Sequence, residues 1–215
     1  MDRSEYYPII VNELLKESSA LKNAINKALK EFRKKYEIEV KEKETRDIFY
    51  LKVPESNSSF TEDFEKIEGI SKNVYKEFYN RKKYLGKINE EKFISHIESQ
   101  TDVIWWHKQS ESGRSVFAIE YYDTQEKINR LFYPDFIIKT ANKLFILDTK
   151  SGITAKSQQT ADKNNALQKW IENNRSKYNF EIIGGIVRES YPNWLINYKK
   201  NYVYENSSDW EMIEF

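Results

Sequence analysis

Two apolar stretches of the sequence each carry an aspartate, and a lysine follows the second one. Asp135 stands directly before the letters FII, while Asp148 follows LFIL and is itself followed by Thr149 and Lys150. If residues 133–149 form a hairpin that turns at residues 141 and 142, Asp135 lies directly opposite Asp148 on the same face of the sheet. Lys150 shares that face, because side chains two residues apart in a strand point the same way. A shift of one residue in the pairing would separate the two acids.

Two neighbouring carboxylates in apolar surroundings are unfavourable, since burial raises the pKa of each and their repulsion raises one of them further. A divalent cation compensates directly, because Mg²⁺ takes one or two carboxylates and keeps water and phosphate oxygens as its other ligands. The backbone carbonyl of Thr149 is a further candidate ligand. Lys150 supplies a positive charge that can orient a nucleophilic water or stabilise a phosphorane-like transition state. The alternative is a solvent-facing strand end with an ordinary Asp–Lys salt bridge, and the apolar strands favour the metal site.

The elements that must position these residues follow from hydrophobic periodicity. Helices are predicted at residues 89–100 and 160–175, and strands at residues 102–109, 115–122, 130–139, 144–149 and 181–187. The strand-like pieces at 201–204 and 209–215 are candidates to extend the sheet edge. This order of helix, about four strands, helix and strand predicts an α/β sandwich around a mixed sheet.

The region before residue 87 has a different pattern. A helix is predicted at residues 6–34, a small hairpin from strands at 36–41 and 48–53, a linker at 54–61 and a second helical stretch at 62–84. We therefore divide the chain into an N-terminal helical and hairpin accessory region, 1–86, and a C-terminal domain, 87–215. The accessory region is expected to serve dimerisation or partner docking.

Composition excludes several classes of protein. Lys and Arg number 35 against 34 Asp and Glu, so a net charge of +1 gives no global signature of nucleic-acid binding, and any such contact must come from local patches. Cysteine is absent, which excludes disulfide scaffolds and thiolate zinc sites and suits a reducing cytosol. Neither a membrane span nor a signal peptide is expected, so the predicted location is cytoplasmic.

In this setting, Pro134–Asp135 followed by Asp148–Thr149–Lys150 resembles the signature of the PD-(D/E)xK nucleases. The surroundings are similar to the nuclease domain at the C-terminus of restriction-type (type III-like) helicase subunits and of related phage-defence proteins. The likeness is carried by IWWHKQ (104–109), FAIEYYD (117–123), RLFYPDFIIK (130–139), LFILDTKSGITA (144–155), ALQKWI (166–171) and GGIV (184–187). It extends over residues 75–215.

The resemblance implies a restriction-endonuclease-like core, with a central mixed β-sheet flanked by helices, in the domain at 87–215. It implies hydrolysis of phosphodiester bonds of DNA, as an endonuclease that uses Mg²⁺ or Mn²⁺. Asp135 and Asp148 would be metal ligands and Lys150 the catalytic lysine. The family pattern accepts Asp as well as Glu before x-K.

The resemblance also implies a setting in bacterial restriction or anti-phage defence. A helicase or ATPase, or another defence-system protein, is then an expected partner, and a homodimer is a further candidate. The sequence has no Walker motif or G-x-G-x-x-G loop, so an ATPase would be a second protein.

Relatives often add a Glu from the first helix and a Gln or Lys from the second. Among Glu90, Glu91 and Glu98, the helical periodicity places Glu90 nearest the inward face, so Glu90 is the predicted further ligand. Its alternative role is that of an ordinary acid in the first turn of a helix. Gln168 and Lys163 are the candidates from the second helix, and their alternative is a solvated helix face. Lys139 and Lys156 are weaker candidates for phosphate contacts.

Two other functions remain open at this point. An RNase would use the same residues, because none of them distinguishes ribose from deoxyribose. A nuclease fold kept for binding DNA or a partner, without turnover, is the second alternative. The presence of Asp135, Asp148 and Lys150 together favours an enzyme.

Overall fold

The computed structural model describes residues 23–32, 64–82, 87–109 and 117–215. The chain divides into two compact units, Met1–Arg46 and Asp47–Phe215. In the first unit, residues 23–32 are helical, within the helix predicted at 6–34. The predicted hairpin at 36–41 and 48–53 and the predicted linker at 54–61 lie outside the described residues. The accessory role expected for residues 1–86 stays a prediction.

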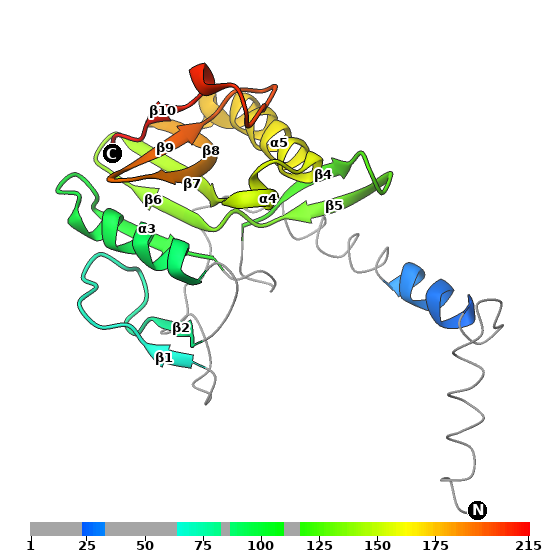
Figure 1. Ribbon diagram of the computed structural model, residues 1–215, viewed down its shortest axis with the longest axis horizontal. Helices are drawn as coiled ribbons and strands as arrows, with labels where there is room; N and C mark the ends of the chain where they lie inside the picture. Colours follow the sequence, from blue (N-terminus) through cyan, green and yellow to red (C-terminus); the bar gives the residue numbers. More distant parts are fainter. Residues whose placement is uncertain (1–22, 33–63, 83–86, 110–116) are drawn as a thin grey trace, which may run out of the picture. The chain divides into compact units, whose positions relative to one another are not determined.

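The second unit is a mixed α/β structure with a six-stranded sheet at its centre (Figure 1). Its helices are α3 (Lys87–Ser99), α4 (Gly152–Ala155) and α5 (Gln158–Asn174), with short 3₁₀ turns at Arg175–Lys177 and Ser207–Asp209. Its strands are β1 (Phe64–Lys66), β2 (Tyr79–Arg81), β3 (Trp105–Lys108), β4 (Ile119–Asp123), β5 (Ile128–Phe132), β6 (Phe136–Lys139), β7 (Lys143–Thr149), β8 (Glu181–Ser190), β9 (Asn193–Asn197) and β10 (Glu211–Met212). The main sheet has the order β10-β9-β8-β7-β6-β3, in which β7 and β8 are parallel and the other pairs antiparallel. The predicted central mixed sheet flanked by helices is therefore confirmed.

Helices α3 and α5 lie on opposite faces of this sheet (Figure 1). Alternate residues of each strand supply the two cores, because successive strand side chains point to opposite faces. On the α3 side, Phe93 packs with Phe136 and Phe145, and on the α5 side Leu167 packs with Ile137 and Ile146. Both faces of β6 and β7 are covered, which explains why these strands read as continuous apolar runs.

Helix α5 approaches strand β8 closely at a glycine. A Cβ atom at Gly184 would lie 2.6 Å from Cδ1 of Ile171 and 3.1 Å from the Cδ atoms of Leu167. The glycine therefore sets the distance between the helix and the sheet. Gln168 uses this proximity, since its Nε2 donates to the Gly184 carbonyl at 2.8 Å.

The β6–β7 hairpin has the predicted register. Phe136 faces Leu147 and Lys139 faces Leu144, so the turn falls at residues 141 and 142. Thr140 closes the turn, because its N–H donates to the Lys143 carbonyl at 3.0 Å and its Oγ1 accepts from the Lys143 N–H at 3.2 Å.

The strand predicted at 130–139 is in fact two strands. The chain leaves β5 after Phe132 and enters β6 at Phe136, and Pro134 between them has no N–H to continue a ladder. Strand β5 pairs with β4 in a separate two-stranded hairpin, and α5 packs against β4. The predicted strand at 115–122 thus belongs to this hairpin and not to the main sheet.

The helix predicted at 62–84 is wrong. Residues 64–82 form the short strands β1 and β2, joined by a loop in which Gly69 has a φ of 78°. Ile70, Val74 and Phe78 recur at helical spacing, but they pack against the core beside α3 without forming a helix. Segment 72–74 also pairs with the edge strand β3, since Trp106 donates its N–H to the Lys72 carbonyl at 2.9 Å.

The C-terminal strands differ from the expectation as well. Strand β9 was not predicted, and it pairs with β8 through a tight turn that contains Pro192. Residues 201–204 form no strand, and Tyr202 is instead buried against Trp210. Within 209–215, β10 does extend the sheet edge, beside β9. Among the residues that the structure describes, no helix is both long and apolar enough to cross a membrane.

Glu98 fastens segment 71–72 to α3. Its carboxylate accepts from the Ser71 N–H at 2.9 Å, the Lys72 N–H at 3.1 Å and the Trp106 indole N–H at 2.5 Å. Burial alone would raise the pKa of Glu98, but these donors hold the pKa below its usual value. Glu98, one of the three helix acids considered for the site, therefore has a structural role.

We expect Glu98→Ala to lower the free energy of unfolding by about 2–3 kcal/mol, because three donors lose a charged acceptor. Urea unfolding followed by tryptophan fluorescence measures this, with the exposed Glu68→Ala as control. The contribution should be present above the unfolded-state pKa of 4.5 and disappear as the pH falls through the lower folded-state pKa. Equal stabilities of the two variants at pH 7 would contradict this role.

Candidate metal and phosphate site

The two aspartates meet where β6 begins and β7 ends. The register of the hairpin continues from Phe136–Leu147 to bring Asp135 to the level of Asp148. Asp148 lies on the α5 face of the sheet, because it follows Ile146 by two residues, and its side chain is buried. The pairing of β6 with β7 therefore brings the two acids together, as expected from the sequence.

Asp135 is held in place by two segments of chain. Its Oδ2 accepts from the Thr149 N–H at 2.7 Å and from the Thr149 Oγ1–H at 2.6 Å. On the other side, the buried Gln109 donates its N–H to the Asp135 carbonyl at 2.8 Å and its Nε2 to the Pro134 carbonyl at 2.8 Å. Gln109 therefore fixes the Pro-Asp dipeptide that precedes β6, a role that nothing in the sequence indicated.

Asp148 forms an ion pair with Lys150, in which Nζ lies 2.7 Å from Oδ2. Burial raises the pKa of Asp148 to about 6, against the opposing effect of the Lys150 charge, and Asp135 raises it further. Burial would lower the pKa of Lys150, but Asp148 and Asp135 together raise it above its ordinary value. Lys150 is therefore a protonated cation at neutral pH. It also donates to the Thr149 carbonyl at 3.2 Å.

Glu90 is the first-helix acid nearest this site. It lines the same cavity as Asp135 and Lys150, and Lys108 of β3 lies beside it, with 3.1 Å between Nζ and Oε2. The negative charge of Glu90 also contributes to the raised pKa of Lys150. Glu91 instead accepts from the Asn80 side chain at 3.4 Å. The choice of Glu90 over Glu91 and Glu98 thus agrees with where the structure places the three side chains.

An open cavity of about 1010 Å³ lies at this site, and the buried Asp148 is not among the residues that line it. Glu90, Asp135, Thr149 and Lys150 form one part of its wall, and Arg130 and Lys163 contribute two more cations. A cavity that combines carboxylate oxygens with several cations suits a metal ion together with a phosphate group.

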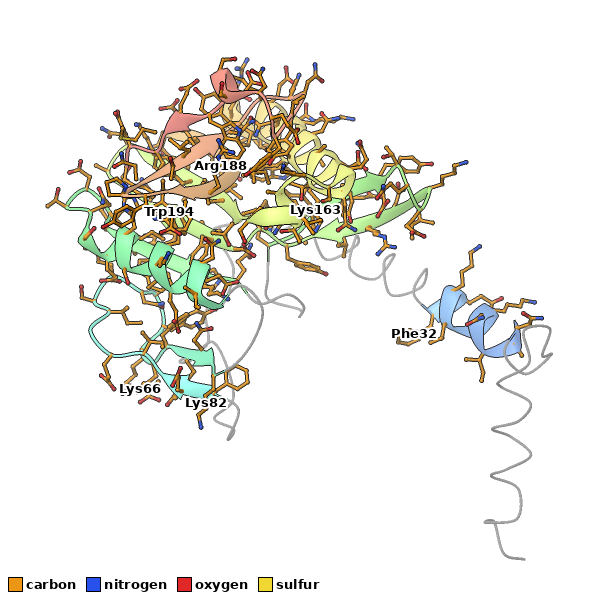
Figure 2. The ribbon with its side chains drawn as sticks, in the orientation of Figure 1. Phe32, Lys66, Lys82, Lys163, Arg188 and Trp194 are labelled. Carbon is orange, nitrogen blue, oxygen red and sulfur yellow. The ribbon has the colours of Figure 1, made fainter. Side chains whose placement is uncertain are left out.

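The two candidates from the second helix lie in different places. Lys163 extends from α5 toward the β4–β5 hairpin, where its Nζ lies 5.8 Å and 5.6 Å from the ring centroids of Tyr121 and Phe132 (Figure 2). Burial lowers the pKa of Lys163, and the charges of Asp148, Lys150 and Arg130 also act on it. Gln168 is bound to the Gly184 carbonyl and does not line the cavity.

Lys139 and Lys156 do not line the cavity either. Lys139 lies at the opposite end of the β6–β7 hairpin, where it donates to the Ala141 carbonyl at 3.0 Å. Lys156 lies 3.8 Å from the Glu205 carboxylate. These two weaker candidates are therefore bound to other parts of the surface.

A further charged pair at the cavity, Asp123 and Arg130, was not predicted from the sequence. Asp123 closes the alternating strand β4, and Arg130 lies in β5, with 3.2 Å between the Arg130 Nε and the Asp123 Oδ2. The one feature of the sequence that could have pointed to Asp123 is an acid at the end of an alternating strand. Most acids in that position are solvated, so the feature is a weak indication of a functional site.

The oxygen atoms of the site bear on whether a divalent metal ion can bind there. Within the described ranges, no cluster of three or more His, Cys, Asp or Glu side chains is arranged to hold a metal. Two carboxylates are nonetheless enough for Mg²⁺, which keeps water and phosphate oxygens as its remaining ligands. The raised pKa of the buried Asp148 is also what a bound cation would relieve. Asp135, Asp148 and the Thr149 carbonyl are therefore oxygen donors of the kind that such an ion takes.

A scan against protein-family models, a search of curated proteins and a search of solved structures each found no match to this chain. The likeness to PD-(D/E)xK nucleases therefore rests on the motif residues of the sequence.

We expect Mg²⁺ or Mn²⁺ to bind this site with an affinity that rises with pH through about 6, because Asp148 must lose its proton to act as a ligand. Below that pH the dissociation constant should increase by about tenfold per pH unit, for the release of one proton. Isothermal titration calorimetry at several pH values measures this.

Asp148→Asn should abolish the binding, whereas Asp102→Asn, which alters an exposed acid elsewhere, should leave it unchanged. Binding that persists in Asp148→Asn, or that does not change between pH 5 and pH 7, would rule out Asp148 as the ligand.

Proposed function

We propose that the protein is a metal-dependent nuclease that hydrolyses phosphodiester bonds of DNA, with a core of the PD-(D/E)xK type. The observation that carries the proposal is the placement of Asp135, Asp148 and Lys150 together at the end of one hairpin, where Asp135 and Lys150 line one cavity and the buried Asp148 is paired with Lys150. The order of α3, three antiparallel strands β3-β6-β7, α5 and the parallel strand β8 supports this type of core.

The residues of the site have separable roles in this proposal. A bound Mg²⁺ would neutralise phosphate charge and lower the pKa of a water nucleophile. Asp135 presents its carboxylate from a fixed position, because Thr149 and Gln109 hold its side chain and its backbone. Asp148 would be the second carboxylate ligand, and its Oδ2 orients Lys150 through their ion pair.

Lys150 acts in the proposal as an electrostatic group. Its raised pKa keeps the ammonium protonated at neutral pH, so it is not a general base. A fixed ammonium stabilises the negative charge that develops on the phosphate oxygens when water attacks phosphorus, and this stabilisation is largest in a site that excludes bulk water. The Asp148 carboxylate supplies the fixed orientation.

The biological setting in restriction or anti-phage defence, and a helicase or other partner, are proposed from the sequence resemblance alone. The proposal of DNA as substrate has the same basis, and RNA is included in the test below.

Cleavage of linear and circular DNA, in single- and double-stranded form, tests the activity, with RNA alongside and with Mg²⁺, Mn²⁺ or EDTA. We expect metal-dependent cutting by the wild type and a loss of about 100-fold or more in Asp148→Asn and Lys150→Met, because each variant removes a charge that acts on the reacting phosphate. Lys143→Met is the matched control, since Lys143 lies at the other end of the same strand.

Folding of each variant must be checked, because the loss of Asp148 leaves Lys150 as an unpaired buried charge. A wild type that binds DNA without cutting any substrate, and whose variants bind equally well, would favour a non-catalytic binding module. Preferential cutting of RNA would favour the RNase.

Glu90→Gln tests the proposed contribution of the first helix. If Glu90 acts on the metal, directly or through a bound water, the variant should need roughly tenfold more Mg²⁺ for half-maximal cleavage and should recover activity at high Mg²⁺. Lys108→Met separates this from the loss of the ion pair, because it breaks the same contact and keeps the carboxylate. A Mg²⁺ requirement that is equal in Glu90→Gln and the wild type would leave Glu90 a structural acid.

A further inference from the structure

The β4–β5 hairpin brings a second charged pair to the cavity. Asp123 faces Ile128 across this hairpin, and Arg130 follows Ile128 by two residues, so the register places Asp123 and Arg130 diagonally on one face. The Arg130 Nε lies 3.2 Å from the Asp123 Oδ2. Both residues line the cavity that Asp135 and Lys150 also line.

Asp123 is a fixed carboxylate that does not depend on Arg130. Its Oδ1 accepts from the N–H groups of Gln125 at 3.1 Å and Glu126 at 3.0 Å, and its Oδ2 accepts from the Gln159 side chain at 3.3 Å. The Glu126 N–H is the largest of the influences that keep the pKa of Asp123 below its usual value. The carboxylate is 1% exposed, so it is an anchor built into the end of the hairpin.

Helix α5 fastens the same turn at a second point. Asp162 accepts from the Thr124 N–H at 2.9 Å and from the Thr124 Oγ1–H at 2.8 Å. Gln159, which holds Asp123, and Lys163, which lines the cavity, come from the same part of α5. Hydrogen bonds therefore join the turn of the hairpin to the beginning of α5. Arg130 lies in β5 of this hairpin, so its backbone is held in a fixed position.

Arg130 is held at one point of its guanidinium and exposed elsewhere. Its Nε is buried beside Asp123, while the side chain as a whole is 41% exposed. A guanidinium carries five donors in a planar fork, so contact through Nε leaves the terminal nitrogens for another acceptor. A phosphate presents two non-bridging oxygens at the spacing that such a fork fits.

We propose that Arg130, oriented by Asp123, binds a phosphate of the DNA backbone adjacent to the one that is cut. This inference rests on the proposed nuclease function and extends it to how the substrate is bound. Lys163 lines the same cavity, and the charges of Asp148, Lys150 and Arg130 all act on it. In this proposal the β4–β5 hairpin binds the DNA backbone through Arg130, while the β6–β7 hairpin carries the residues of the cleavage site.

An ordinary salt bridge across a hairpin is the competing explanation. Three neutral donors already satisfy Asp123, so the protein does not need Arg130 to bury this acid. Lysine separates the two explanations, because a lysine ammonium would pair with Asp123 and leave no donor fork for a phosphate. If the pair has only a structural role, Arg130→Lys should keep the ion pair with Asp123 and bind DNA like the wild type.

Fluorescence anisotropy of the full-length protein with short fluorescein-labelled DNA, in EDTA and over a series of NaCl concentrations, tests the proposal. We expect Arg130→Gln and Arg130→Lys each to weaken binding by about tenfold and to reduce the slope of log Kd against log salt by about one. Arg175→Gln removes an exposed arginine at the other end of α5 and should bind like the wild type. If Arg130→Gln lowers the melting temperature, Arg130→Lys, which keeps a partner for Asp123, carries the test.

The outcomes separate this inference from the nuclease proposal. A wild type that binds and cuts DNA, with Arg130 variants of unchanged affinity and salt slope, overturns the role of Arg130 and leaves the nuclease intact. If Arg130→Lys alone binds DNA with the affinity of the wild type, the claim that the guanidinium binds the phosphate through two oriented nitrogens is wrong. A wild type that neither binds nor cuts nucleic acid overturns both proposals.

Discussion

The pairing of β6 with β7 is the constraint on which the rest of the candidate site depends. It brings Asp135 to the level of Asp148 and Thr149, so that Thr149 can hold the Asp135 carboxylate through two hydrogen bonds. Because both faces of these strands are apolar, burial alone does not fix their register. The turn fixes it, through the two hydrogen bonds between Thr140 and Lys143. A slip of one residue would turn Asp148 toward α3 and away from Lys163.

Three carboxylates of this unit show how a structural acid differs from a candidate functional one. Glu98 and Asp123 each accept from several neutral donors, and the pKa of each lies below its usual value. Asp148 is buried with a lysine as its ion-pair partner, and its pKa is raised to about 6. A buried acid with a raised pKa is a cost to the fold that a metal ion would remove. This contrast is the physical basis for placing the chemistry at Asp148.

Helix α5 connects the parts of the cavity. Gly184 lets the helix approach β8, and Gln168 ties it to the β8 backbone. At its other end, Gln159 and Asp162 hold the turn of the β4–β5 hairpin. The position of Lys163 and that of the hairpin thus follow from one rigid element. Gln168, considered as a site residue from the sequence, contributes to the cavity through this packing.

Elements whose signal is local can be read from the amino-acid sequence alone. The apolar runs of β6 and β7, the two-residue turn between them and the helices α3 and α5 could be predicted, and with them the meeting of Asp135, Asp148 and Lys150 at one end of the hairpin. Tertiary contacts decided the rest. Residues 64–82 have apolar residues at helical spacing, yet Gly69 and the bonds to Glu98 and β3 make them an irregular edge segment. Asp123 and Arg130 meet through the register of the β4–β5 hairpin. Contacts with α5, which is distant in the sequence, hold the turn of that hairpin, and such contacts leave no period in a sequence.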